Sequence, residues 1–174
     1  MKTLLGSLIL LWVFISSDAY AVDNVHFSGV LVSQPCTLPE DDTHIALEFD
    51  TVVTKYLYLY QRTKSKPFVI HLLDCNPSMM GAVNVTFEGQ PDGELTNLLA
   101  IDGASTAQGI AIGIELADGT LLPINKTSPA QPLVSGNNSL SFSAFVQIQP
   151  TVLTNKALKN GDFTAIVTFV VGYQ

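Results

Sequence analysis

Positively charged residues are scarce in this sequence. The 174-residue chain has 8 Lys and Arg residues against 15 Asp and Glu, which gives a formal net charge of −7 at pH 7. A nucleic-acid-binding protein neutralises phosphates with cationic side chains, and an anionic membrane surface attracts the same charges. The composition therefore argues against both kinds of partner.

Catalytic motifs are also missing. The sequence has no Gly-x-Ser-x-Gly elbow, no His-Glu-x-x-His and no phosphate-binding loop. Its three histidines, His26, His44 and His71, keep no constant spacing to a nucleophile. The acidic run 40–42 could bind calcium weakly, but we favour a solvated loop. We therefore expect no enzyme, no metal, no cofactor and no small-molecule substrate.

Only two cysteines are present, Cys36 and Cys75. In an exported protein an even pair predicts one disulfide, with two buried thiols as the alternative. Such a bridge closes a loop of roughly 40 residues, worth about 4 kcal/mol in the loop-entropy model. The single tryptophan, Trp12, precedes both cysteines, so the Cys–Trp–Cys arrangement of immunoglobulin domains is absent.

Long apolar runs are absent except near the N-terminus. Lys2 precedes an apolar run over residues 4–15, and Ala19-Tyr20-Ala21 has the small-x-small form of a cleavage site. The run is too short for a transmembrane helix. We therefore predict a signal peptide over residues 1–21 and an exported protein.

A sustained helical period is missing, whereas runs with the period of two typical of strands recur between turn residues. Strands are predicted at 45–50, 68–75, 83–87, 110–116 and 140–148. The aromatic stretch 52–60 is predicted as a further strand or edge ribbon, and Asp118-Gly119 as a hairpin turn. Loops are predicted at 37–43, 61–67, 125–138 and 153–160. The pattern favours one antiparallel β-sandwich of immunoglobulin-like size.

The last stretch, residues 161–174, has the clearest alternation. Six apolar residues share one predicted face: Phe163, Ala165, Val167, Phe169, Val171 and Tyr173. A long apolar strand at the end of a chain has no following strand to cover its edge, and an uncovered edge invites pairing with another chain. We expect another polypeptide to pair with this strand.

A second alternating strand is predicted at residues 22–32. One face carries Val25, Phe27, Gly29 and Leu31, and Pro35 ends the strand just before Cys36. A glycine on the apolar face suggests the close approach of another backbone.

In order and spacing these elements resemble the structural subunits of chaperone–usher pili (fimbriae) of Gram-negative bacteria. The resemblance is carried by the N-terminal strand followed by Pro35-Cys36, the strand 68–75, the stretch 109–119, the strand 140–146 and the closing stretch 161–173. The chain looks most like a minor tip or adaptor subunit of P-type pili, because its N-terminal strand lies close to the expected mature N-terminus. Ala144-Phe145 replaces the commoner Ala-Arg-Tyr, which disfavours a main rod subunit.

The resemblance implies an all-β, incomplete immunoglobulin-like antiparallel sandwich that lacks its seventh strand. It implies three partners: a periplasmic chaperone that lends a strand, an outer-membrane usher, and neighbouring pilus subunits that exchange their N-terminal extensions for the chaperone strand. Residues 22–34 are then the donor strand, which enters the groove of a neighbouring subunit, and residues 35–174 are the pilin domain. The six terminal-strand residues line the acceptor groove and bind the chaperone. The expected location is a cell-surface fimbrium that contributes to cell adhesion.

Three alternatives remain open. The N-terminal strand could pair with the C-terminal strand of the same molecule, because the alternation would look identical. A self-closed, secreted immunoglobulin-like binding domain would fit three Asn-x-Ser/Thr tripeptides, which begin at Asn84, Asn125 and Asn137. The chain could also be a terminator or a major subunit of the same class of pilus.

Overall fold

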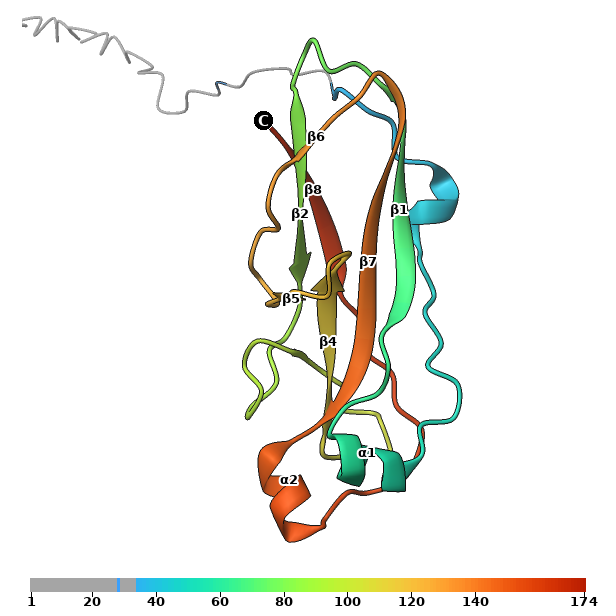
Figure 1. Ribbon diagram of the computed structural model, residues 1–174, viewed down its shortest axis with the longest axis vertical. Helices are drawn as coiled ribbons and strands as arrows, with labels where there is room; N and C mark the ends of the chain where they lie inside the picture. Colours follow the sequence, from blue (N-terminus) through green and yellow to red (C-terminus); the bar gives the residue numbers. More distant parts are fainter. Residues whose placement is uncertain (1–27, 29–33) are drawn as a thin grey trace, which may run out of the picture. The chain divides into compact units, whose positions relative to one another are not determined.

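The structure is a computed structural model and describes residue 28 and residues 34–174. Its elements, in chain order (Figure 1), are η1 (Glu40–Thr43), α1 (Thr54–Tyr60), β1 (Lys66–Cys75), β2 (Ala82–Glu88), β3 (Leu99–Ala100), β4 (Ile110–Leu116), β5 (Leu121–Leu122), β6 (Gln131–Pro132), β7 (Gly136–Ile148), α2 (Pro150–Asn155) and β8 (Thr168–Tyr173). No helix within these residues is long and apolar enough to cross a membrane.

The strands form two antiparallel sheets. The larger sheet has the order β1-β7-β4-β3, with β5 also paired to β4, and the smaller sheet has the order β6-β2-β8. β7 is the longest strand and pairs with both β1 and β4. The predicted all-β antiparallel fold is thus confirmed, together with the strands at 68–75, 83–87, 110–116 and 140–148.

The two sheets are joined by a cluster of aromatic side chains. Phe87 of β2 packs edge-on against Phe142 of β7, with ring centroids 5.0 Å apart. Phe68 of β1 lies 5.8 Å from Phe142 and 5.9 Å from Phe87. Alternation along each strand turns these rings into one shared core, where burial of each ring contributes a few kcal/mol.

The prediction of a strand at 52–60 is wrong, because Thr54–Tyr60 is the helix α1. The helix ends at Gln61, which has a left-handed conformation (φ 66°) and donates its N–H to the carbonyl of Leu57. Leu57 is 2% exposed and anchors the helix in the core. Aromatic residues favour strands only where they find a sheet to join, and here one buried leucine and a C-terminal cap decide for a helix.

Four further predictions need correction. Residues 150–155, which the sequence suggested would be the end of a strand and a connection, form α2, with Pro150 at its first turn. The predicted loop 125–138 contains β6 and the start of β7. The predicted strand 45–50 belongs to no strand, and the strand predicted from residue 161 begins only at Thr168.

Candidate functional site

β8 lies at the edge of the smaller sheet and pairs with β2 alone. Beside this ladder Ala82 and Gln174 exchange two hydrogen bonds, with N–O distances of 2.9 and 3.0 Å. Bonded and non-bonded pairs alternate along an antiparallel ladder. Every second residue therefore directs its N–H and C=O away from β2, where the described residues offer no partner: Phe169, Val171 and Tyr173. We call this side of β8 the open edge.

The stretch that leads into β8 is held by a loop and not by a strand. The N–H groups of Thr106 and Ala107 donate to the carbonyl of Asp162 at 2.9 and 3.0 Å, and the N–H of Asp102 donates to the carbonyl of Thr164 at 2.7 Å. Residues 165–167 have no backbone–backbone hydrogen bond within the described chain. The open edge therefore continues upstream of β8.

The six apolar residues predicted on one face of the terminal stretch do share one face, and all pack against the core. None of them is fully buried, whereas Val85 and Phe87 on the adjacent β2 are only 1% and 2% exposed. Burial still raises the pKa of the Tyr173 hydroxyl above its ordinary value. The inward side chains of this edge thus leave apolar surface that one more strand would cover.

A second extended segment, residues 44–52, also lacks sheet pairing; we call it the wall segment. Its residues form no backbone–backbone hydrogen bond with any described residue. Ile45, Leu47 and Phe49 pack against the same core as β8 and stay half-buried, while the residues between them are exposed. Phe49 lies 6.2 Å from Phe163, ring centroid to ring centroid. Two unpaired, half-buried apolar segments therefore meet at this end of the domain.

Side chains hold the wall segment to β1 at two points. Lys66, the first residue of β1, forms an ion pair with Asp50 at 3.0 Å and donates to the carbonyl of Glu48. Asp42, just before the wall segment, accepts hydrogen bonds from the backbone N–H and the ring of His71, the latter at 2.9 Å. These contacts replace the backbone ladder that a paired strand would have.

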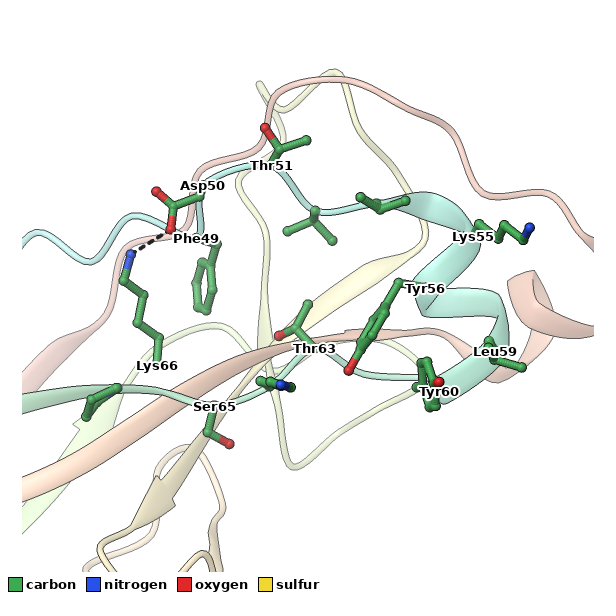
Figure 2. A pocket seen from close by; sticks show the side chains of 14 residues that line it. Phe49, Asp50, Thr51, Lys55, Tyr56, Leu59, Tyr60, Thr63, Ser65 and Lys66 are labelled. Carbon is green, nitrogen blue, oxygen red and sulfur yellow. Dashed lines mark hydrogen bonds and ion pairs between the residues drawn. The ribbon is translucent and has the colours of Figure 1, made fainter.

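A pocket of about 640 Å³ separates the wall segment from the chain that enters β1. Figure 2 shows Phe49, Asp50 and Thr51 on one side and Thr63, Ser65 and Lys66 on the other, with α1 closing one end. The Lys66–Asp50 ion pair crosses the gap. The wall segment therefore stands apart from β1 here.

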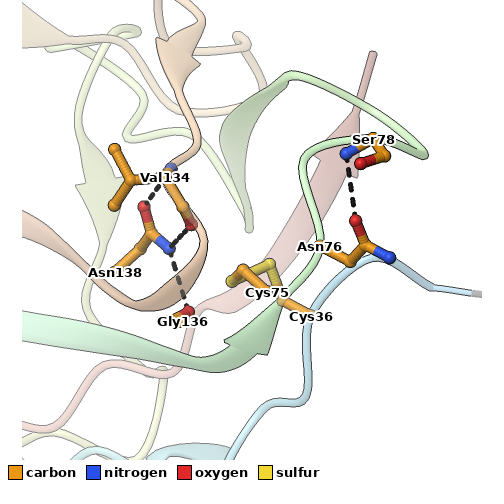
Figure 3. Close-up of a disulfide and its surroundings, with 7 residues drawn as sticks. All are labelled: Cys36, Cys75, Asn76, Ser78, Val134, Gly136 and Asn138. Carbon is orange, nitrogen blue, oxygen red and sulfur yellow. Dashed lines mark hydrogen bonds between the residues drawn. A yellow bond between two sulfur atoms is a disulfide. The ribbon is translucent and has the colours of Figure 1, made fainter.

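The predicted disulfide between Cys36 and Cys75 is confirmed. It joins the chain just before the wall segment to the last residue of β1 (Figure 3). Beside it Thr37 and Leu73 exchange two backbone hydrogen bonds of 2.8 Å. The chain that leads into η1 and the wall segment is thus fixed covalently to the end of β1.

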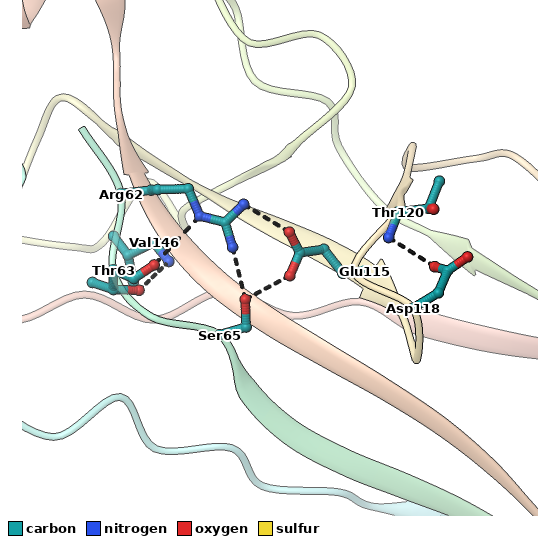
Figure 4. A network of polar contacts seen from close by, with 7 residues as sticks. All are labelled: Arg62, Thr63, Ser65, Glu115, Asp118, Thr120 and Val146. Carbon is teal, nitrogen blue, oxygen red and sulfur yellow. Dashed lines mark hydrogen bonds and ion pairs between the residues drawn. The ribbon is translucent and has the colours of Figure 1, made fainter. Parts of the chain in front are cut away.

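A partly buried ionic network ties the loop after α1 to β4 (Figure 4). Arg62 donates to Glu115 at 2.7 Å and to Ser65 at 2.7 Å, and its guanidinium lies 3.6 Å from the centre of the Phe145 ring. The hydrogen bond from Arg62 holds the pKa of the Glu115 carboxyl below its ordinary value, against the opposing effect of burial. Phe145 lies against Gly113, where an added Cβ would be 2.1 Å from the ring.

The structure brings together the six terminal-strand residues, but it does not describe the predicted donor strand. Val25, Phe27, Gly29 and Leu31 lie outside the described residues, so the donor strand stays a prediction. Sequence reasoning noted the alternation at 45–50 but missed that these residues form a second unpaired segment. It also missed Lys66 and Asp42, because no sequence pattern indicates contacts across 16 and 29 positions. The acidic run 40–42 forms η1, and no cluster of metal-ligating residues occurs in the described chain.

Comparison with known proteins identifies the family. Residues 25–174 match the family model described as fimbrial protein. The chain is 38% identical over 161 residues to the uncharacterized fimbrial-like protein YfcP of Escherichia coli (strain K12), covering 91% of this chain and 88% of YfcP. The chain therefore belongs to the fimbrial protein family.

Solved structures agree on the fold. The P pilus rod subunit PapA superposes with a TM-score of 0.70 at 23% identity, over 81% of this chain and all of PapA. A chaperone–usher pilus subunit from a structure that describes rod uncoiling gives a TM-score of 0.69 at 22% identity, over 88% of this chain and 96% of that chain. The fold is thus the immunoglobulin-like fold of pilins.

The family defines the protein as a fimbrial subunit, and its fold is that of chaperone–usher pilus subunits. It is a structural protein and not an enzyme, exported to the cell-surface pilus, where it polymerises with other subunits.

Proposed function

We propose that the open edge and the half-buried face beside it are an acceptor site for one extended strand of another polypeptide. A periplasmic chaperone supplies that strand first, and the N-terminal extension of a neighbouring subunit replaces it at the outer-membrane usher. Residues 22–34 serve as the donor strand for a further subunit, with Val25, Phe27, Gly29 and Leu31 facing its groove.

One observation carries this proposal. Phe169, Val171 and Tyr173 direct their backbone groups away from β2 without a partner in the described chain, and their side chains are only partly buried. An added strand would satisfy the backbone groups by β-augmentation and cover the side chains at the same time. Covering each large apolar side chain is worth up to roughly 1.5–3 kcal/mol, which is large beside a domain stability of about 5–15 kcal/mol.

The test is binding of a capped peptide that copies residues 24–34 to the purified chain. We expect the melting temperature to rise with peptide concentration, because a ligand of the folded state at 100 times its Kd stabilises by about 2.7 kcal/mol. The same peptide with Phe27→Asp is the control and should have no effect. A chain that is a stable monomer at every concentration, indifferent to both peptides and to a periplasmic chaperone, would contradict the proposal.

We further propose that the subunit is a minor, adaptor-type component and thereby contributes to adhesion. The donor pattern close to the expected mature N-terminus supports this position. An adaptor should exchange faster with the extension of a different subunit than with its own. The measurement compares exchange rates for the peptide 24–34 and for peptides that copy the extensions of subunits encoded by neighbouring genes. Faster exchange with its own peptide would indicate a rod subunit.

A further inference from the structure

The wall segment is held in place without any backbone pairing. Over residues 44–52 the described chain provides no backbone–backbone hydrogen bond, although Ile45, Leu47 and Phe49 alternate toward the core like the residues of a strand. Most buried extended segments are held in place by backbone hydrogen bonds to a neighbouring strand. Something else must fix the position of this one.

The side chains that fix it come from β1. Lys66 reaches two acceptors on the wall segment, the carboxylate of Asp50 at 3.0 Å and the carbonyl of Glu48. At the other end Asp42 bonds both the backbone and the ring of His71. Asp42 is 9% exposed, whereas Asp50 is exposed to solvent. The Lys66 end is therefore the weaker and more salt-sensitive of the two attachments.

Without these attachments the hydrophobic effect would draw the wall segment toward β8. Its half-buried side chains and those beside β8 would both lose solvent-exposed surface if the two segments closed on each other. Phe49 and Phe163 already lie 6.2 Å apart. On the opposite side, the pocket of about 640 Å³ lies between residues 49–52 and the chain that enters β1, so open space separates this end of the segment from β1.

We propose that Lys66 and Asp42 are positioning residues of the acceptor site: they hold the wall segment back toward β1 and so keep the open edge accessible to an incoming strand. This inference rests on the proposed function. It adds that the contacts of Lys66 and Asp42, near the two ends of the wall segment, control the access of an incoming strand to the open edge. Neither residue touches the incoming strand.

The test measures the association rate of the capped peptide 24–34, which contains no Asp, Glu, Lys or Arg, with the purified chain. Lys66→Met should lower the rate about two- to five-fold, the range that corresponds to an exposed ion pair. Lys66→Arg should restore it. Lys64→Met is the matched control, since Lys64 lines the same pocket but forms no ion pair in the described chain, and its rate should equal that of the wild type.

Salt separates positioning from a general loss of structure. Raising the salt concentration from 20 to about 500 mM should slow peptide association with the wild type and with Lys64→Met, because it screens the Lys66–Asp50 pair. The rate for Lys66→Met should not respond. Asp42→Asn, which keeps an oxygen acceptor for His71, should give a smaller decrease than Lys66→Met.

Each failure has its own reading. If the wild type binds neither the peptide nor a periplasmic chaperone, the proposed function fails and the positioning role fails with it. If the wild type binds but Lys66→Met binds equally fast and keeps the salt response, only the positioning role is overturned. Equal losses in Lys66→Met and Lys64→Met would also overturn it, since they would point to net charge.

Discussion

Glu115 is one of the few charged residues buried in the described chain, and its partner Arg62 fixes its protonation. The hydrogen bond from Arg62 lowers the pKa of Glu115 from 4.5. A carboxyl with a lowered folded-state pKa stabilises the fold fully above its unfolded pKa, and this stabilisation disappears as pH falls through the folded value. The network of Figure 4 therefore contributes at neutral pH and is lost in acid.

We predict that Glu115→Gln lowers the free energy of unfolding at pH 7 by about 1.5–3 kcal/mol, the value of hydrogen bonds to a charged group. Below pH 4.5 the difference from the wild type should shrink. Urea unfolding across pH 3–7 measures both effects. Glu88→Gln, at an exposed position on β2, should have little effect. An acid dependence identical in Glu115→Gln and the wild type would show that another group is responsible.

At the scale of elements, we predict that an aspartate on the inner face of β8 abolishes peptide binding, whereas an aspartate on its outer face does not. Phe169 points inward and is partly buried, whereas the next residue, Val170, is 44% exposed. Phe169→Asp places a charge in the apolar face and should abolish binding of the peptide 24–34. Val170→Asp adds the same charge on the outer face and should leave binding within about three-fold, as surface substitutions usually do.

Co-purification with a periplasmic chaperone gives a second measurement, and it should follow the same order. If Phe169→Asp retains binding while remaining folded by circular dichroism, the acceptor site does not lie on this face of β8. If both variants lose binding equally, the proposed face is not distinguished from its outer side.

The sequence alone correctly predicts those strands whose apolar residues alternate and whose backbone also finds a neighbouring strand. β1, β2, β4 and β7 alternate in sequence and find neighbours in the sheets. The wall segment shows why alternation is insufficient: Ile45, Leu47 and Phe49 face the core as predicted, yet a ladder needs a partner and the described chain supplies none. Period two reports which face is buried, and it does not report what pairs with the backbone.

The prediction of a strand at 52–60 failed because alternation was present without a buried face of period two. Tyr56, Tyr58 and Tyr60 alternate and favour a strand, but the only buried residue of α1 is Leu57 between them. Tyr58 instead uses its hydroxyl to accept the backbone N–H of Leu158 at 3.1 Å. Tertiary contacts of this kind override local propensity and leave no mark in the sequence.

At the scale of the whole molecule, we predict that the disulfide is a major source of stability. The bond spans a sequence separation of 39 residues, for which the loop-entropy model gives about 4 kcal/mol. The double variant Cys36→Ser, Cys75→Ser should lose about that much in urea unfolding, and reduction of the wild type should give the same loss. A double variant as stable as the wild type would show that the neighbouring Thr37–Leu73 bonds suffice.

The position of that bond also decides how the domain carries mechanical load. In a fibre under tension, pull that arrives from the N-terminal side reaches Cys36 and passes through the sulfur–sulfur bond directly to Cys75. From there the covalent route leads into β2, which is hydrogen-bonded to β8 along its length. Residues 37–74, which include the wall segment and α1, lie outside this covalent route, although β1 within them is paired with β7. Stretching the pilus would therefore load the β2–β8 ladder without first extending the loop between the two cysteines.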